Sequence, residues 1–314
     1  MSTEKSGSNI SDTASSAIET TRNFIEDNPH WLFLLPALLI YLPFLVLPAL
    51  GIFGLSTFQW SGLGDMSFNG VENFVTAISD TVVSTSLWHN VKIAFWSLIL
   101  QAGIGLALAL AIYRLSDRFR QFFQVVYLLP MTLMAVAVSM IWGYIYNPSY
   151  GVLNTAIQKI GMDWNPLWLG SKSLALYAII IVATWQWTGF RVVLWLAGLD
   201  SIDESLLEAA RMDGAGPLQR FRYVTLPLLK PVAIFISIYT IIGSFNSFVY
   251  VWVMTRGGPG HASEVMVTWI YKNAFLQSNF GQAAAISVLL FVIVLVLSLL
   301  NMRLGDREAG GANP

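Results

Sequence analysis

The segment 208-EAARMDGAG-216 is a short polar stretch in a chain whose other long segments are apolar. The chain has 314 residues, of which 55% are hydrophobic and 11% charged. Soluble domains carry about 25% charged residues, so this composition indicates an integral membrane protein. The absence of cysteine excludes disulfide scaffolds, thiolate metal sites and cysteine nucleophiles. The polar segment therefore needs an explanation other than solubility in lipid.

Six segments around it are apolar and long enough to cross a bilayer, which takes roughly 20 residues. They are residues 31–58, 88–113, 122–146, 174–197, 228–253 and 282–302. None alternates in the manner of a barrel strand, so we expect an all-α membrane protein with six transmembrane helices. Together they predict one membrane domain over 30–305, between a disordered polar tail at 1–29 and a short tail at 306–314.

The positions of Lys and Arg predict the orientation of these helices, because cytoplasmic loops carry an excess of both. With a cytoplasmic N-terminus, the inner side holds Lys5, Arg22, Arg114, Arg118, Arg120, Arg211, Arg220, Arg222, Lys230, Arg303 and Arg307. The outer side then holds Lys159, Lys172, Arg256 and Lys272. We therefore expect both termini, and the loop that contains the polar segment, to be cytoplasmic.

Several functional signals are missing from the sequence. No predicted span contains Asp or Glu, which argues against self-powered ion-coupled transport. No GxxxxGK[ST], HExxH or GxSxG motif occurs, so neither nucleotide hydrolysis nor a common hydrolase site is indicated. We interpret His30, His89 and His261 as separate, solvated residues at span edges rather than metal ligands. The chain is expected to be non-catalytic and to hold no metal.

Small residues in the second span predict close helix packing. The run 103-GIGLALALA-111 places Gly103, Ala107 and Ala111 on one stripe and Gly105 with Ala109 on another. Small residues four apart let helices approach closely in lipid. General bundle packing is the simpler interpretation of both stripes.

The polar segment itself reads as two short helices joined by a tight turn. Ser201 and Glu204 have the spacing of a capping box, in which each side chain bonds a free amide of the other residue. Residues 205–212 favour a helix, and Gly214 and Gly216 suit the left-handed turn that ends it.

A second short helix is expected to start at Pro217 and run through Arg222. On the first helix, one face is formed at three-to-four spacing by Leu206, Ala209, Ala210 and Asp213. Small alanines on an exposed face favour docking against another protein over a merely solvated loop.

These residues resemble the EAA motif of binding-protein-dependent ABC transporter permeases. The matching positions are Glu208, Ala209, Ala210 and Gly214, followed at the family's spacing by Val224, Leu226 and Pro227. Val224 stands where isoleucine is common. The stretches 146-YNPSYGVLN-154, 254-MTRGGP-259 and 271-YKNAFLQSNFGQAAAIS-287 are similar to carbohydrate permeases. The resemblance covers roughly residues 30–305.

The resemblance implies a type I ABC importer permease fold and a coupling role for loop 198–227. The residues that would couple to the ATPase are Glu208, Ala209, Ala210, Asp213, Gly214 and Pro227. It also implies a heterodimer with a second related permease, two cytoplasmic ATPase subunits and an extracytoplasmic solute-binding protein. ATP and magnesium would be bound by the ATPase, with no cofactor in this chain and no nucleic acid partner.

Two stretches have the chemistry for a sugar-like solute in the membrane. At helical spacing Phe245, Phe248 and Trp252 form an aromatic stripe, with Asn246 and Tyr250 beside it. Such a stripe more commonly packs against neighbours. Polar side chains in apolar runs, Gln186 and Asn246, favour a solute path, because an unpaired amide in hydrocarbon is costly. The substrate-path candidates are Gln186, Asn246, Tyr250, Phe245 and Trp252.

Arg191 is a further isolated polar residue, nearly two turns inside the inner end of the fourth span. Its side chain either snorkels to the surface or pairs with a carboxylate of a partner.

The sequence thus predicts the cell-membrane permease subunit of an ABC importer for a sugar or sugar-like solute: an oligosaccharide, a polyol or a glycerol-3-phosphate type. The alternative is a self-contained secondary transporter or channel for a small uncharged solute. A membrane enzyme is disfavoured. Docking of the binding protein is assigned either to 59-QWSGLGDMSFNG-70 or to 255-TRGGPGHASE-264.

Overall fold

The computed structural model describes residues 30–309 of the chain, with side chains for 33–303. It divides into two compact units, residues 1–54 and 55–314. The predicted tail at 1–29 lies outside the described residues, as do residues 310–314 of the predicted second tail. Residues 306–309 continue the last helix.

The described part of the first unit is an apolar helix. It comprises α2 (His30–Tyr41), a π-helical turn η1 (Leu42–Val46) and α3 (Leu47–Leu55). The 23 residues Phe33–Leu55 are long and apolar enough to cross a membrane. None of these residues is buried within the structure, and an apolar surface on all sides of a helix is typical of a membrane span.

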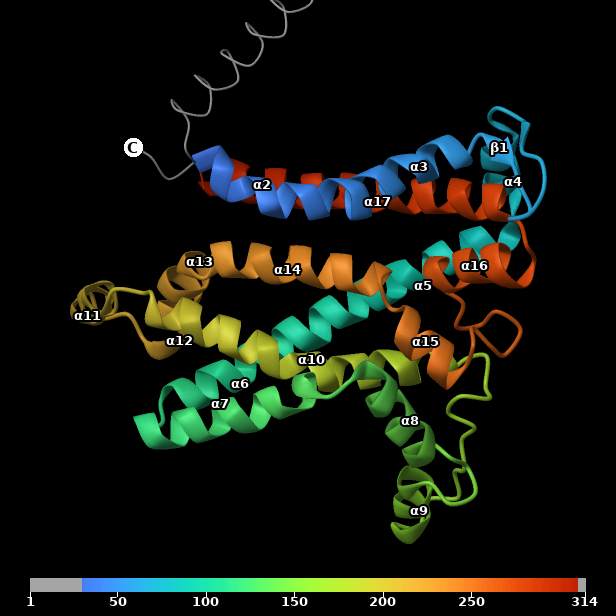
Figure 1. The fold of residues 1–314 in the computed structure, drawn as a ribbon. Coiled ribbons are helices and arrows are strands. Elements are labelled where there is room, and N and C mark those ends of the chain that lie inside the picture. The colour runs from blue at the N-terminus through green and yellow to red at the C-terminus, as the bar shows by residue number, and fades with distance from the viewer. Residues whose placement is uncertain (1–29, 310–314) are drawn as a thin grey trace, which may run out of the picture. The chain divides into compact units, whose positions relative to one another are not determined.

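The second unit begins with a small hairpin and continues as helices (Figure 1). Strands β1 (Phe58–Gln59) and β2 (Ser67–Phe68) pair antiparallel, with Phe58 opposite Phe68 and Gln59 opposite Ser67. The helices before the polar loop are α4 (Glu72–Ser79), α5 (Thr81–Ser97), η2 (Leu98–Ala102), α6 (Gly103–Tyr113), α7 (Asp117–Thr132), α8 (Ala135–Ile145), α9 (Val152–Lys159) and α10 (Ala175–Asp200).

The remaining elements form the polar loop and the C-terminal part of the unit. They are α11 (Glu204–Met212), α12 (Pro217–Arg220), η3 (Phe221–Thr225), α13 (Leu226–Leu228), α14 (Lys230–Phe245), α15 (Phe248–Met254), α16 (Met266–Tyr271), η4 (Lys272–Leu276) and α17 (Phe280–Ala309). Elements labelled η are π-helical.

Helix α10 is the central element of this unit. It packs against α5, α6, α7, α8, α14 and α15, while α14 packs against α5 and α17 (Figure 1). Sixteen of its 26 residues are buried, including Ile179, Ile180, Val192 and Leu196. A helix that is apolar on every side and buried on most of them needs neighbours all round.

Four described helices are long and apolar enough to span a membrane, and the number rises to six if each of two bent pairs is one span. The single helices are Phe33–Leu55, Thr81–Tyr113, Ala175–Asp200 and Phe280–Arg303. The expected second span was too short, because its helix starts at Thr81 rather than at 88. The Asp80 carboxylate accepts the Val82 N–H there and caps the helix.

The expected third span, 122–146, is two helices rather than one. Asp117–Thr132 and Ala135–Ile145 meet at an angle of 92°. Leu133 and Met134 between them are extended, with ψ of 144° and 132°. Pro130 lies inside the preceding helix and lacks the N–H that a continuous helix needs.

The expected fifth span, 228–253, is also interrupted. The chain bends by 62° between Pro217–Leu228 and Lys230–Phe245. A second interruption lies at Asn246 and Ser247, between α14 and α15, where both residues leave helical geometry. The prediction of one continuous aromatic stripe was therefore wrong for Phe245, which lies before this break and is buried.

Glycines set the closest helix contacts of α10. A methyl group at Gly189 would lie 1.7 Å from the Tyr127 carbonyl oxygen of α7, and one at Gly105 of α6 would lie 2.9 Å from Arg191 Cβ. The stripe of Gly105 and Ala109 is buried as predicted, whereas Gly103 is exposed. Small residues thus bring α6 and α7 onto α10.

Gly189→Ala is expected to lower the stability of the purified protein. The backbone of α7 cannot yield as a flexible side chain would, so the variant should lose about 1–3 kcal/mol or fail to accumulate. The measurement is the midpoint of thermal inactivation in mild detergent. Gly143→Ala is the matched control, since nothing lies within 4 Å of its added methyl group. Equal midpoints for the two variants would contradict the packing assigned to Gly189.

Candidate functional site: a polar elbow and a membrane cavity

The polar loop folds into two helices, as predicted, but its first cap differs from the prediction. Helix α11 begins at Glu204, and Asp203 is its N-cap, accepting the Ser205 N–H at 2.9 Å. That hydrogen bond to the charged form lowers the pKa of the Asp203 carboxyl. The expected capping box of Ser201 and Glu204 was wrong, because Ser201 still belongs to the end of α10, where its hydroxyl donates to the Gly198 carbonyl.

The turn after α11 depends on Gly214. Its φ is +79°, a left-handed conformation that costs other residues about 1–2 kcal/mol. The Ala215 N–H then donates to the Ala210 carbonyl and closes the helix end. Gly216 is not left-handed, contrary to the prediction. It is the N-cap of α12, and its N–H donates to Gln219 Oε1 at 2.8 Å.

These two helices, residues 204–220, form what we call the elbow. It projects at one end of the unit, away from α9 and α16 (Figure 1). No residue of α11 or α12 is buried. Large apolar side chains are exposed there and on the adjacent η3: Leu206 47%, Met212 88%, Leu218 77% and Tyr223 72%. Exposed apolar side chains on a polar loop are typical of an interaction surface.

The family-motif residues lie on this elbow and just after it. Glu208 and Ala209 are exposed on α11, and Ala210 is partly buried beside them. Asp213 is the C-cap of α11, and Pro227 lies in α13. The elbow is joined to α10 by residues 201–203 and to α14 through η3 and α13.

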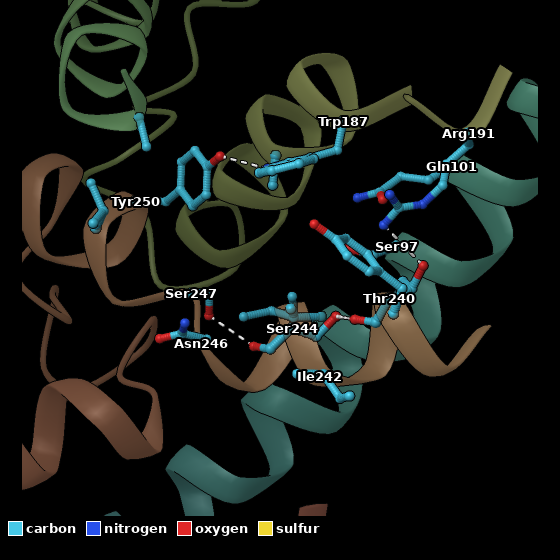
Figure 2. Close-up of a pocket in the computed structure, with 16 residues that line it drawn as sticks. Ser97, Gln101, Trp187, Arg191, Thr240, Ile242, Ser244, Asn246, Ser247 and Tyr250 are labelled. Carbon is cyan, nitrogen blue, oxygen red and sulfur yellow. Dashed lines mark hydrogen bonds between the residues drawn. The ribbon is translucent and has the colours of Figure 1, made fainter. Parts of the chain in front are cut away.

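A cavity of about 550 Å³ lies among the helices on either side of the elbow (Figure 2). Its volume falls within the roughly 300–1,000 Å³ of small-ligand sites. Its lining residues are Ile93, Ser97, Gln101, Ala135, Ala183, Trp187, Arg191, Tyr239, Thr240, Ile242, Gly243, Ser244, Asn246, Ser247, Val249 and Tyr250. Both α10 and α14, the helices that flank the elbow in the chain, contribute to this wall.

Several polar groups that line the cavity are free to accept hydrogen bonds. The hydroxyls of Thr240, Ser244 and Ser247 each donate to a backbone carbonyl of the preceding turn. Their protons are thereby used, and their free lone pairs can accept hydrogen bonds from a ligand. Gln101 Oε1 is buried and has no partner. With Trp187, Tyr239 and Tyr250 they form a wall suited to a hydroxylated, sugar-like molecule.

Of the predicted substrate-path residues, Asn246 and Tyr250 line this cavity and the other three do not. Phe245 is 3% exposed and belongs to the packed interior. Trp252 stacks on Phe248, with ring centroids 5.5 Å apart, and contacts Tyr271 edge-on.

Gln186 lies behind the cavity and supports its wall. Its Nε2 donates to the Leu133 carbonyl at 2.9 Å, at the break between α7 and α8. Its Oε1 accepts from the Tyr250 hydroxyl at 2.7 Å, and that hydroxyl accepts from Trp187 Nε1 at 2.9 Å. The side chain thus satisfies a carbonyl that the broken helix leaves free, and it fixes the cavity face of Tyr250.

Arg191 lies in the cavity wall and is 2% exposed, so in this chain it does not snorkel. Its Nη2 donates to Thr240 Oγ1 at 3.2 Å, while Nε and Nη1 have no partner. The guanidinium lies 4.9 Å from the ring centroid of Tyr239 and 5.5 Å from that of Phe190.

Sequence reasoning missed Gln101 and Thr240, although Gln101 is a lone amide in an apolar run.

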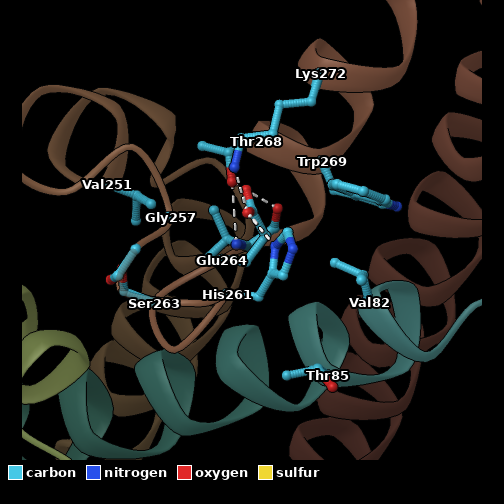
Figure 3. A network of polar contacts seen from close by, with 12 residues as sticks. Val82, Thr85, Val251, Gly257, His261, Ser263, Glu264, Thr268, Trp269 and Lys272 are labelled. Atoms are coloured by element: carbon cyan, nitrogen blue, oxygen red, sulfur yellow. Dashed lines mark hydrogen bonds and ion pairs between the residues drawn. The ribbon is translucent and has the colours of Figure 1, made fainter. Parts of the chain in front are cut away.

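A second polar cluster holds the loop between α15 and α16 (Figure 3). Glu264 is fully buried, and its Oε2 accepts from Lys272 Nζ and pairs with His261 Nδ1 at 2.9 Å. His89 Nδ1 lies 2.8 Å from the Glu264 carbonyl oxygen. The prediction of solvated histidines was therefore wrong for His89, which is 7% exposed, because this loop covers it. The side chain of His30 lies outside those described.

Asn90 ties the same loop to the cavity helix. Its Nδ2 donates to the Ser244 carbonyl at 3.0 Å, and its Oδ1 accepts the Met266 N–H at 2.9 Å. The loop between α15 and α16, α5 and α14 are therefore connected by buried hydrogen bonds rather than by apolar contact alone.

Comparison with known proteins identifies the class. Residues 101–307 match the family described as "Binding-protein-dependent transport system inner membrane component". The probable ABC transporter permease protein YurN of Bacillus subtilis is 37% identical over 276 residues, covering 87% of this chain and 94% of that protein. The trehalose/maltose transport system permease protein MalF of Thermococcus litoralis is 33% identical, covering 88% and 92%.

A solved structure agrees with the fold. The crystal structure of a bacterial ABC transporter involved in the import of the acidic polysaccharide alginate contains a chain with a TM-score of 0.79 at 23% identity, covering 92% of this chain and 99% of that one. This chain therefore belongs to the family of binding-protein-dependent transport system inner membrane components, the permeases of ABC transporters. It is a multi-pass inner-membrane protein, and the predicted family and location are confirmed.

Tyr250→Phe is expected to destabilise the cavity wall. Removing the hydroxyl leaves Gln186 Oε1 and Trp187 Nε1 without their partner, at a cost of about 1–2 kcal/mol. A lower thermal-inactivation midpoint checks this expectation. Tyr144→Phe is the control, since its side chain is 64% exposed. The assigned role of the hydroxyl is wrong if both variants have the same thermal-inactivation midpoint.

Proposed function

We propose that this chain is the non-catalytic membrane subunit of an ABC importer for a sugar or sugar-like solute. It spans the membrane six times with both termini in the cytoplasm, and the elbow is its coupling segment. ATP and magnesium bind in a separate ATPase, and no cofactor is held here. The observation that carries the proposal is the exposed elbow, whose two flanking helices, α10 and α14, both line the cavity.

This connection provides a mechanical route from the elbow to the cavity. Force on α11 reaches α10 through residues 201–203 and reaches α14 through the π-helical and helical turns of 217–228. Movement of the elbow therefore changes the distance between two walls of one cavity. A partner that binds the elbow differently in its ATP-bound and nucleotide-free states shifts the cavity between inward and outward access.

The charge distribution supports a cytoplasmic elbow. The ion pair of Arg120 with Asp200 joins the start of α7 to the end of α10, so the basic turn between α6 and α7 lies at the same end as the elbow (Figure 1). Arg114 lies in that turn and Arg118 at the start of α7, while Arg211 and Arg220 lie in the elbow and Arg222 in the adjacent η3. Basic loops on one side of a bilayer are typical of the cytoplasmic face.

The cavity supports a hydroxylated solute. Its aromatic faces suit sugar C–H surfaces, and its acceptor hydroxyls suit sugar O–H groups. The class fits the names of relatives, which include a trehalose/maltose permease. Oligosaccharides, polyols and solutes of the glycerol-3-phosphate type remain within it.

The partners in this proposal are a second related permease, two ATPase subunits and an extracytoplasmic binding protein. The family description names dependence on a binding protein. On the outer side, the β-hairpin exposes Leu63 at 87% and Phe68 at 71%, whereas the loop at 255–264 is held by the buried Glu264. We assign docking of the binding protein to the hairpin at 59–70.

Glu208→Lys is expected to uncouple transport from ATP hydrolysis. It reverses a charge on the exposed elbow without touching the cavity, so it should reduce binding-protein-stimulated ATPase activity by roughly tenfold or more. The full importer is purified in mild detergent, and co-purified subunits are identified beside the assay. Lys159→Glu reverses an exposed charge on α9 and should leave coupling unchanged.

A chain that purifies alone and supports solute flux without ATP would contradict the coupling role of the elbow. The secondary-transport alternative would then take its place.

A further inference from the structure

We infer that Arg191 binds an anionic group, a carboxylate or a phosphate, on the transported solute. The inference rests on the proposed function, because it assigns the cavity to the solute, and it narrows the solute to a hydroxylated acid. Its basis is an unpaired cation inside the cavity wall.

The guanidinium is poorly satisfied by its own chain. All three guanidinium nitrogens can donate hydrogen bonds. Only Nη2 has a protein partner, Thr240 Oγ1, at the long distance of 3.2 Å. Nε and Nη1 are buried and unpartnered. An unpaired buried charge is costly, and a guanidinium stays protonated in proteins. The cost is removed when an anion occupies the site.

No acidic side chain of the described residues meets this charge. The described ion pairs join Arg120 to Asp200, and His261 and Lys272 to Glu264. Along the elements that line the cavity, α5, η2, α8, α10, α14 and α15, the one acidic residue is Asp200. It lies nine residues from Arg191, about 13 Å along the helix, and already pairs with Arg120.

The aromatic rings hold the cation in place but do not neutralise it. Tyr239 and Phe190 lie close to the guanidinium, and such contacts stabilise a cation less than an ion pair with good hydrogen bonds does. The close approach of Gly105 to Arg191 Cβ fixes the start of the side chain on the α6 side. The head group is therefore positioned before any solute arrives.

The shape of the free donors selects the anion. A guanidinium has two planar pairs of N–H donors that match the two oxygens of a carboxylate or a phosphate, Nε with Nη2 and Nη1 with Nη2. In Arg191 the unpartnered member of each pair is Nε or Nη1. Figure 2 shows the Arg191 head group among Gln101, Thr240 and Trp187. The neighbouring hydroxyls and Gln101 Oε1 offer acceptors, which suit O–H groups and repel a second anion. A solute with one acidic group beside several hydroxyls satisfies both parts of this wall.

The test is direct binding to the assembled importer in nanodiscs without nucleotide. The probes are galacturonate and glycerol 3-phosphate, with the methyl ester of galacturonate and glycerol as uncharged counterparts. Binding is measured by thermal stabilisation, which depends on ligand concentration. We expect at least one acid to bind better than its uncharged counterpart. Arg191→Gln should weaken the binding of that acid by about 10–100-fold, since a charged hydrogen bond is lost. The binding affinity for the uncharged probe should not change.

Arg191→Lys keeps the charge and should recover part of the affinity. The two acids distinguish a carboxylate from a phosphate. The inference is overturned if neither acid binds at millimolar concentration, or if acid and counterpart bind equally and Arg191→Gln changes neither. It is also overturned if Arg191→Gln releases the second permease, because the counter-charge is then a partner carboxylate.

These failures differ from failure of the proposed function. Binding is measured without ATP, and the ATPase response to Glu208→Lys is measured separately. If acid and uncharged probe bind equally while the ATPase response to Glu208→Lys is as expected, only the role of Arg191 is refuted.

Discussion

The side-chain amide of Gln186 is the interaction on which the cavity depends. In lipid every backbone carbonyl needs a partner within the protein, and the break between α7 and α8 leaves that of Leu133 free. Gln186 satisfies it and also accepts the Tyr250 hydroxyl, which in turn accepts from Trp187. One buried amide thus joins the break between α7 and α8, the central helix α10 and the segment beyond the α14 break. These hydrogen bonds fix the position of the aromatic wall of the cavity.

The glycines and the hydrogen bonds of Gln186 have complementary roles. Gly189 brings the backbone of α7 against α10, one turn from Gln186, and Gly105 brings α6 against Arg191. Such contacts leave α10 little freedom to tilt independently of α6 and α7. A push on the elbow is therefore expected to move these helices together against α14, so the cavity opens or closes as a whole.

Local signals in the sequence were sufficient for the class, the apolar segments and the two helices of the elbow. Gly214 and Pro217 carry their turn chemistry wherever they occur, so their roles could be predicted. The breaks at 133–134 and 246–247 could not, because they are stabilised by side chains distant in sequence, as Gln186 stabilises the first. His89 was misjudged for the same reason, since the loop at 264 that covers it is 175 residues away. Of the lone polar residues in apolar runs, Gln186 was predicted as part of the solute path, whereas Gln101 was missed and Arg191 was not assigned to the cavity. The sequence does not separate residues that line the cavity from residues that support its wall.

The central claim, that the elbow controls access to the cavity, can be measured by thiol labelling, since the chain has no cysteine of its own. A single cysteine at Ile242, in the cavity wall, is exposed to an impermeant thiol reagent from the outer side of the reconstituted importer. The account predicts that ATP with the binding protein increases the labelling rate, and that Glu208→Lys in the same chain abolishes the increase. A labelling rate that does not change with ATP, or that changes equally in the Glu208→Lys protein, would contradict it.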